Sequence, residues 1–307
     1  MAFGSSLARR RNWHACLAAV FLLISGAPAA AADLVLDRAG VVQAMINGVP
    51  LRLKVEFDHT EGITLNPDAA ARAGLGEGTG KWVERIGPIR LEGRSAKLRL
   101  MLSGVETVAR IRWRDSPAAI GADGAVSVHT LPFDTVTLRR AEDGPGQREL
   151  SFPTRLHDNH GVHYRLRVGR RRVAVRFSFD RPRTTAPAAA AAVVAEQQGG
   201  RLAAERSAEE IAPGIERPVR MLRFDRPLLI GELSVPLVMA RAADFRGGHE
   251  FAREEQPAHD GEIVVTGALP SQDALYRITL GLDVLGRCST ATYQRATGEL
   301  RLRCTQD

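Results

Sequence analysis

Apolar and polar residues alternate most regularly between residues 51 and 57, where leucine, valine and phenylalanine are separated by charged side chains. This period of two is typical of a strand that buries one face. Asn47-Gly48 stands just before it and favours a two-residue hairpin turn, because both central positions of that turn need positive φ. The pattern therefore predicts an antiparallel pair of strands whose second member ends at Asp58.

A short helix is predicted soon after this hairpin. Asn66 is a suitable N-cap, Pro67 suits the first helical position, and Gly74 stands where the helix would stop.

The same arrangement recurs once. Residues 173–179 alternate in the same way and end at Asp180, and an alanine-rich helix is predicted to begin at Pro187. The two aspartates are 122 residues apart, and the helix-opening prolines Pro67 and Pro187 are 120 residues apart. Such self-similarity indicates two diverged copies of one unit. We therefore assign residues 33–155 to a first lobe and residues 156–307 to a second.

The remaining pattern predicts short strands and few helices. Strands are expected at 82–86, 89–91, 96–102, 108–113, 132–138, 149–152, 219–224, 227–231 and 233–240, with turns at Gly87-Pro88, Glu92-Gly93 and Ser103-Gly104. The strands at 132–138 and 149–152 are expected to pair as a hairpin. Residues 186–209 are expected to be helical with a break at Gly199-Gly200, and residues 243–261 to be a polar loop, either a lid over a cleft or disordered. Short strands at close spacing predict an all-β protein.

Four segments, in this order, resemble the pepsin and retropepsin-like aspartic proteases. The strand that ends in an aspartate, followed by a short apolar strand and a helix, resembles the catalytic loop of that family. Residues 122–128 resemble the Asp-Gly-hydrophobic-hydrophobic-Gly segment of a first lobe, residues 278–287 the hydrophobic-Leu-Gly-Asp segment of a second, and residues 293–302 the final hairpin. The resemblance implies two β-barrel lobes with short helices and a cleft between them.

The resemblance also implies a pair of catalytic carboxylates. In the family, two aspartates share one proton because like charges so close together cannot both ionise, and they activate a water that attacks the peptide. Asp58 and Asp180 are the candidates for this dyad, and Thr60 is the candidate loop hydroxyl. The alternative is that each aspartate accepts backbone hydrogen bonds at the end of its strand.

The central motif departs from the family pattern. His59-Thr60 and Arg181-Pro182 stand where the family has Thr/Ser-Gly. Arg181 and Arg183 are expected to favour the ionised form of Asp180, which opposes proton sharing. Two functions follow as hypotheses: a catalytically silent relative that binds a peptide or an envelope component in the cleft, or an aspartic endopeptidase that is active at acidic pH.

The N-terminus predicts export. Three arginines precede the apolar run of residues 16–24, and small residues follow at 27–32, which together are typical of a secretory signal peptide. We expect residues 1–32 to be removed and the protein to be periplasmic or secreted. Removal deletes three arginines and no acid, so the formal net charge falls from +7 to +4. No later segment is apolar enough to cross a membrane, and export argues against a nucleic-acid partner.

Cys288 and Cys304 are the cysteines left after Cys16 is removed with the signal. Two cysteines in an exported protein most often pair. Residues 289–303 predict two strands joined by a turn, which would place the two cysteines opposite one another.

Histidine and arginine clusters raise two further possibilities. His157, His160 and His163 have a spacing that suggests metal binding, but an extended segment would keep their side chains from converging, so no metal is expected. The arginines of the hairpin from Arg165 to Arg176 either form a solvated face or bind an anionic envelope component. No motif for nucleophilic serine, zinc or nucleotide chemistry is found, so no cofactor is expected.

Overall fold

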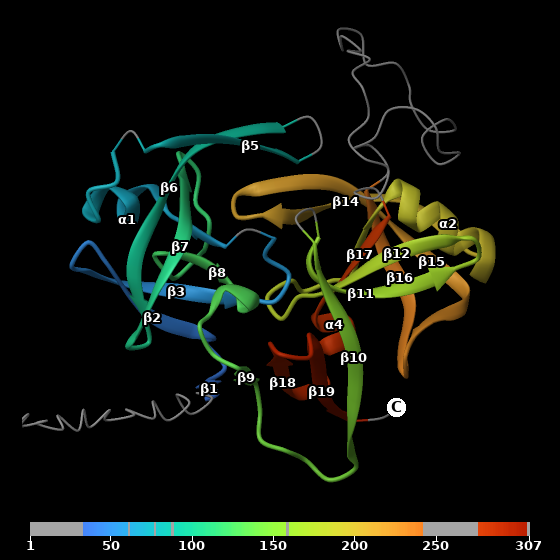
Figure 1. The fold of residues 1–307 in the computed structure, drawn as a ribbon. Helices are drawn as coiled ribbons and strands as arrows, with labels where there is room; N and C mark the ends of the chain where they lie inside the picture. The colour runs from blue at the N-terminus through green and yellow to red at the C-terminus, as the bar shows by residue number, and fades with distance from the viewer. Residues whose placement is uncertain are drawn as a thin grey trace, which may run out of the picture. The chain divides into compact units, whose positions relative to one another are not determined.

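The computed structural model describes residues 33–60, 62–76, 78–86, 89–157, 160–241 and 276–305. The predicted signal peptide and the predicted polar loop at 243–261 lie outside these residues. All the described residues belong to one compact unit of the chain. The fold is mostly β (Figure 1), so the all-β prediction is confirmed.

Seven strands from the first half of the chain form one sheet, in the order β2-β3-β8-β4-β7-β6-β5. Their bounds are β2 Val41–Ile46, β3 Val49–Glu56, β4 Ile63–Leu65, β5 Gly80–Ile86, β6 Ile89–Leu102, β7 Val105–Arg114 and β8 Gly124–Ser127. An additional pairing between β2 and β6 closes six of these strands into a barrel and leaves β5 outside it.

The other twelve strands form a second sheet, in the order β1-β9-β18-β19-β10-β11-β12-β17-β13-β16-β15-β14. Their bounds are β1 Asp33–Leu36, β9 Thr135–Arg139, β10 Gln147–His157, β11 Gly161–Val168, β12 Arg171–Phe177, β13 Thr185–Pro187, β14 Arg201–Ala212, β15 Ile215–Ile230, β16 Leu233–Arg241, β17 Arg277–Leu280, β18 Cys288–Gln294 and β19 Glu299–Thr305.

The strand pairings repeat between the two halves. In the first sheet, β2 and β3 are antiparallel, β3 and β8 parallel, β8 and β4 antiparallel, and β4 and β7 parallel. In the second, β11 and β12, β12 and β17, β17 and β13, and β13 and β16 follow the same sequence of directions. Each series ends with two antiparallel pairings, through β6 to β5 and through β15 to β14.

The helices are short. In the described residues they are α1 Pro67–Arg72, α2 Ala188–Gln198 and α4 Leu282–Leu285, with a 3-10 turn at Val128–Thr130. Pro67 opens α1 and Gly74 follows it with a φ of +67°, as the sequence indicates. Asn66 lies at the N-cap position, but its side chain bonds Ala118, Ala119 and Ala122 instead of the helix. No helix in the described part of the chain is long and apolar enough to span a membrane.

Three expectations about turns, hairpins and helix length are wrong. Glu92-Gly93 is not a turn, because residues 89–102 form one continuous strand, β6. The strands β9 and β10 do not pair as a hairpin, because β18 and β19 lie between them in the sheet. The helix α2 ends at Gln198, and residues 201–212 form strand β14, since Gly199 turns the chain with a φ of +70° and β14 then pairs with β15.

The hydrophobic core follows the alternation seen in the sequence. The apolar residues of β3 and β12 that alternate with charged ones are all buried: Leu51, Leu53, Val55, Val173, Val175 and Phe177. Phe57 and Phe179, which are 122 residues apart and so occupy equivalent places, meet edge to face with their ring centroids 5.1 Å apart. Such aromatic pairs contribute about 1 kcal/mol beyond the area they bury. This contact holds the two aspartate segments next to each other.

Candidate functional site

The site is built where β3 and β12 end. Asp58 follows β3 directly after Phe57, and Asp180 follows β12 directly after Phe179. Because the two rings are in contact, the structure brings the two segments that carry the aspartates together. Asp58 is buried, whereas the side chain of Asp180 is 39% exposed.

Two arginines of the second half of the chain bind Asp58. Arg181 Nε lies 3.1 Å and Arg176 Nη2 lies 3.3 Å from Asp58 Oδ2, and Arg176 also donates to the backbone oxygen of Asp58. Burial opposes ionisation, but the positive charges of Arg181 and Arg176 outweigh it and hold the pKa of Asp58 below its ordinary value. Asp58 is therefore an ionised carboxylate at neutral pH.

A lysine of the first half binds Asp180. Lys54 Nζ lies 2.8 Å from Asp180 Oδ1 and also donates to the backbone oxygen of Ala39, at 2.7 Å. Burial raises the pKa of Asp180, and Lys54 opposes this rise only in part. The negative charges of Glu56 and Asp58 add to the rise. The two aspartates thus have pKa values displaced in opposite directions.

The cations occupy equivalent places in the repeat. Lys54 and Arg176 are 122 residues apart, as are Asp58 and Asp180. Each cation stands four residues before the aspartate of its own repeat and pairs with the aspartate of the other. Lys54 with Asp180 and Arg176 with Asp58 are hereafter called the crossed ion pairs.

Arg181 is not where the sequence indicated. It was expected to favour ionisation of its neighbour Asp180, yet it binds Asp58, and the pKa of Asp180 is raised. The reason is geometric, because the guanidinium reaches across to the other repeat. Its remaining nitrogens donate within its own half of the chain, to the backbone oxygens of Glu210 at 3.2 Å and Ile211 at 2.7 Å on β14.

The two repeats also carry threonines near their aspartates, Thr60 in the first and Thr184 in the second. Thr60 lies against the backbone of Gly161. A Cβ added to Gly161 would come within 3.2 Å of the Cα of Thr60. In the second repeat Thr184 bonds the short helix α4 and the residue before it. Its amide and hydroxyl donate to the two carboxylate oxygens of Asp283, at 2.9 and 2.8 Å, and its hydroxyl accepts from the amide of Gly281 at 3.1 Å.

Two hairpins approach each other beside the site. The β5–β6 hairpin and the β14–β15 hairpin occupy the same place in the two series of pairings, and Figure 1 shows β5 and β14 on the same side of the structure. Ile86, Ile211 and Ile215 from their ends form a small buried cluster. Because Arg181 bonds both Asp58 and β14, it links the second hairpin to the first aspartate.

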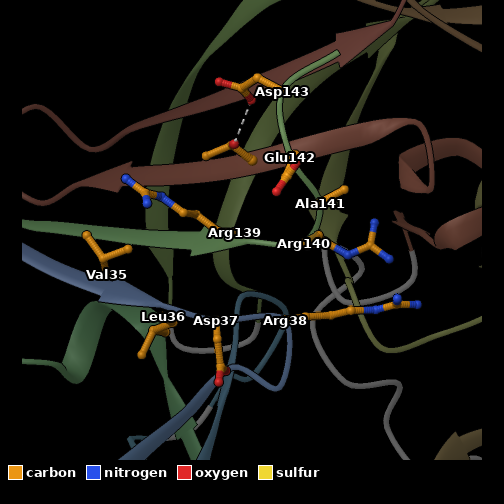
Figure 2. A pocket seen from close by; sticks show the side chains of 10 residues that line it. Val35, Leu36, Asp37, Arg38, Arg139, Arg140, Ala141, Glu142 and Asp143 are labelled. Carbon is orange, nitrogen blue, oxygen red and sulfur yellow. Dashed lines mark hydrogen bonds between the residues drawn. The ribbon is translucent and has the colours of Figure 1, made fainter.

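A surface groove lies elsewhere, between the ends of β1 and β9. It has a volume of about 810 Å³ and is lined by Val35, Leu36, Asp37, Arg38, Arg139, Arg140, Ala141, Glu142, Asp143 and Thr290. Figure 2 shows Arg38 and Arg140 extending to one side and Arg139 to the other. Neither Asp58 nor Asp180 lines this groove.

No family model and no curated protein matches the chain.

The three histidines converge, contrary to the expectation from sequence. Strand β10 ends at His157 and β11 begins at Gly161, and the rings of His157, His160 and His163 come within 5.2 to 6.5 Å of one another, centroid to centroid. The amide of His160 donates to the backbone oxygen of His157 at 3.0 Å, so these two histidines do not lie along one extended strand. Within the described ranges, no three His, Cys, Asp or Glu side chains form a group that could hold a metal ion.

Sequence reasoning missed the roles of Lys54 and Arg176. The signal was present, because the repeat spacing that relates the aspartates also relates these two cations. A basic residue on a strand with alternating apolar positions ordinarily lies on the face that is exposed to solvent. The pairing of Lys54 and Arg176 with the opposite repeat is therefore evident only from the contacts.

Proposed function

We propose that this chain is an exported, catalytically silent protein with a two-lobed fold of the pepsin and retropepsin type, and that it binds a peptide segment between its two repeats. The matching series of strand pairings and the four resembling sequence segments support the fold. The short strands β4 and β13, each followed by a helix, also support the proposed fold.

The crossed ion pairs carry the proposal that catalysis is lost. A proteolytic dyad needs two carboxylates that share one proton and hold a water between them. Here Asp58 is neutralised by Arg176 and Arg181, and Asp180 is paired with Lys54. A buried carboxylate between two guanidinium groups binds a proton poorly, so Asp58 is a structural anion that ties the repeats together.

The hairpins support the proposal that the protein binds a peptide. The strands β5 and β14 each lie at the end of their sheet, so one side of each has backbone groups that pair with no strand of the sheet. An extended peptide can add to such an edge through backbone hydrogen bonds, with its side chains in neighbouring pockets. Such binding needs no catalytic chemistry.

The test combines cleavage and binding. Purified protein lacking residues 1–32 is incubated with a random peptide mixture between pH 3 and pH 7, and products are identified by mass spectrometry. We expect no cleavage that depends on Asp58 or Asp180, together with retention of some of the peptides on immobilised protein. Cleavage abolished by Asp180→Asn would contradict the proposal.

An acid-active endopeptidase is the second candidate, and the opposite pKa displacements favour it. The pKa of Asp58 is lowered and that of Asp180 is raised, which is the division of roles that a general base and a general acid require. In this case activity appears only at acidic pH, where protonated Asp180 releases Lys54. The pH series described above distinguishes the two candidates.

The location of the protein and its binding of an anionic envelope component are also proposals. Residues 1–32 would direct the protein to the periplasm or the medium, and N-terminal sequencing of the exported protein tests this. Five arginines of the β11–β12 hairpin are exposed: Arg165, Arg167, Arg170, Arg171 and Arg172. They offer a face for an anionic envelope component, whereas Arg176 is buried against Asp58.

A further inference from the structure

We propose that the corner between β10 and β11 is a pH-sensitive element, which opens locally in mild acid because His160 gains a proton. The corner comprises His157, His160, Gly161 and His163. This inference goes beyond the proposed peptide binding and does not depend on it.

Two histidines of the corner are buried and lie together. His160 is 5% exposed and His163 is 3% exposed, and their ring centroids are 5.2 Å apart. The ring of His157 lies 5.4 Å from that of His160, and His157 is the partner of Gly161 in the register of β10 and β11. A proton on His160 therefore adds a charge to a group of packed imidazoles.

Within the described residues, His160 lacks an acceptor for a proton on Nδ1. That nitrogen is buried without a hydrogen-bond partner, whereas an imidazolium donates from both ring nitrogens. The Nδ1 of His163 lies 3.1 Å from the backbone oxygen of Gly161 and donates to it. Charging His160 would thus leave a buried N–H without an acceptor, which costs free energy.

The charged groups that act on the two buried rings are basic. They come from four neighbouring strands: His157 of β10, Arg165 of β11, Arg176 of β12 and Arg277 of β17. Burial is the largest cause, and together with these positive charges it lowers the pKa of His160 to about 4. The pKa of His163 is lowered as well, and its hydrogen bond opposes this shift only in part.

The acidic groups on this side of the site are engaged with other bases. Those that act on Arg176 are Asp58, Glu56 and Glu84. They contact Arg181 at 3.1 Å, His59 at 3.4 Å and Arg114 at 2.6 Å, respectively. In the part of the chain that the structure describes, neither His160 nor His163 has a carboxylate at ion-pair distance.

Protonation of His160 is therefore coupled to opening of the corner. The pKa of this imidazole is about 4 in the closed corner and returns to its ordinary value of 6.5 once water reaches the ring. The preference for the closed form is complete above pH 6.5 and is lost as the pH falls toward 4. Between pH 7 and pH 5 these values raise the open fraction about twentyfold.

The corner lies against the segment that carries Asp58. A Cβ added to Gly161 would come within 2.7 Å of the backbone oxygen of His59, so the two backbones are in close contact. Gly161 also has a φ of +59°, which favours glycine. Opening of the corner would separate β11, in the second half of the chain, from the residues that follow Asp58 in the first.

Hydrogen–deuterium exchange of the protein lacking residues 1–32 tests the proposal. Exchange is measured at pH 7, 6 and 5, and rates are corrected for the intrinsic effect of pH. From pH 7 to pH 5 we expect the protection of residues 160–168 to fall about twentyfold, while β18 and β19 keep theirs. His160→Phe retains a ring that cannot be protonated and is expected to remove most of this fall.

Two further variants make the test specific. His160→Asn also removes the titrating group and is measured alongside His160→Phe, with circular dichroism showing that each variant is folded. His129→Asn is the matched control, because burial lowers the pKa of His129 to about 4 as well, but this residue bonds Ser127 in the first half of the chain. We expect His129→Asn to leave the fall at residues 160–168 unchanged.

Three results would contradict the proposal. They are an unchanged protection of residues 160–168 between pH 7 and pH 5, an equal fall in β18 and β19, and a fall that persists in folded variants of His160. The first two are decided in the unsubstituted protein. Peptide retention is measured separately, so failure of the pH-sensitive corner and failure of the proposed function are distinguishable.

Discussion

Lys54 Nζ lies 2.8 Å from Asp180 Oδ1, and Arg176 Nη2 lies 3.3 Å from Asp58 Oδ2. Arg176 stands 122 positions after Lys54, and Asp180 stands 122 positions after Asp58. The two contacts are therefore related by the internal repeat. A dyad of carboxylates facing each other has the same symmetry, but here each carboxylate faces a cation of the opposite repeat. The two halves are thus held together by ion pairs in which each repeat supplies the cation for the aspartate of the other.

The two ion pairs should differ in their contribution to stability. Asp58→Asn leaves Arg176 buried without its anion, so we expect the free energy of unfolding to fall by about 3 kcal/mol. Asp180→Asn removes a carboxylate whose raised pKa means that the fold disfavours its charge, so at neutral pH we expect the free energy of unfolding to change little or to rise slightly. Urea unfolding monitored by circular dichroism measures both, and equal losses would show that burial does not distinguish the pairs.

Acid should destabilise the protein through Asp58. Its pKa is lower in the folded protein than the ordinary value of 3.8. The stability that it contributes is therefore present above pH 3.8 and lost as pH falls through the folded-state pKa. Asp180 acts in the opposite direction, because its raised pKa favours the folded state as the pH falls.

Two variants separate these effects on the acid side of the stability curve. Measured between pH 2 and pH 6, the decline toward low pH should be shallower in Asp58→Asn than in the unsubstituted protein and steeper in Asp180→Asn. An unchanged curve in Asp58→Asn would mean that its ion pairs do not form.

The C-terminal strands should be covalently linked. Cys288 and Cys304 are opposite one another in the register of β18 and β19 and are bonded in the structure. A bridge that closes a loop of this size stabilises by about 3 kcal/mol on the chain-entropy estimate. Alkylation of the exported protein under denaturing conditions should find no free thiol, and reduction should lower the urea midpoint. Two reactive thiols before reduction would argue that the link does not form in the exported protein.

The contact between the hairpins should control their local opening. Ile211 lies in the cluster with Ile86 and Ile215, and Ile211→Ala removes part of that contact at a cost of about 2 kcal/mol. We expect faster amide hydrogen exchange in both β5 and β14, with little change in the core strands β3 and β12. Val83→Ala is the control, because Val83 is an exposed residue of β5. Faster exchange confined to β14 would show that the two hairpins open independently.

Much of the fold is encoded locally and could be predicted. The Asn47-Gly48 turn, the alternating burial of β3 and the opening of α1 at Pro67 depend on neighbouring residues, whereas β12 is buried on both faces from Val173 to Phe177. The order of the strands in the second sheet could not be predicted from the sequence. The placement of β18 and β19 between β9 and β10 joins segments about 150 residues apart, and no local pattern specifies it. Strand β14 was predicted as helix because alanine and glutamate favour helices, and its pairing with β15 overrides that propensity.

The candidate site was predicted in position but not in its chemistry. Repeat spacing identified Asp58 and Asp180, and the aromatic contact brings their segments together. The partners of these aspartates come from the opposite repeat, and long flexible side chains such as Lys54 and Arg181 can reach several acceptors. Which acceptor each one binds depends on the tertiary packing, so the sequence did not reveal it.

The most direct test is the titration of Asp58 followed by the 13C shift of its carboxyl carbon in the unsubstituted protein and in Asp180→Asn. If the crossed ion pairs hold the two aspartates apart, Asp58 titrates in a single step below the ordinary value of 3.8, and Asp180→Asn leaves that step almost unchanged. Two coupled steps in the unsubstituted protein that collapse to one in Asp180→Asn would show a shared proton. That result would contradict the crossed ion pairs and favour the endopeptidase.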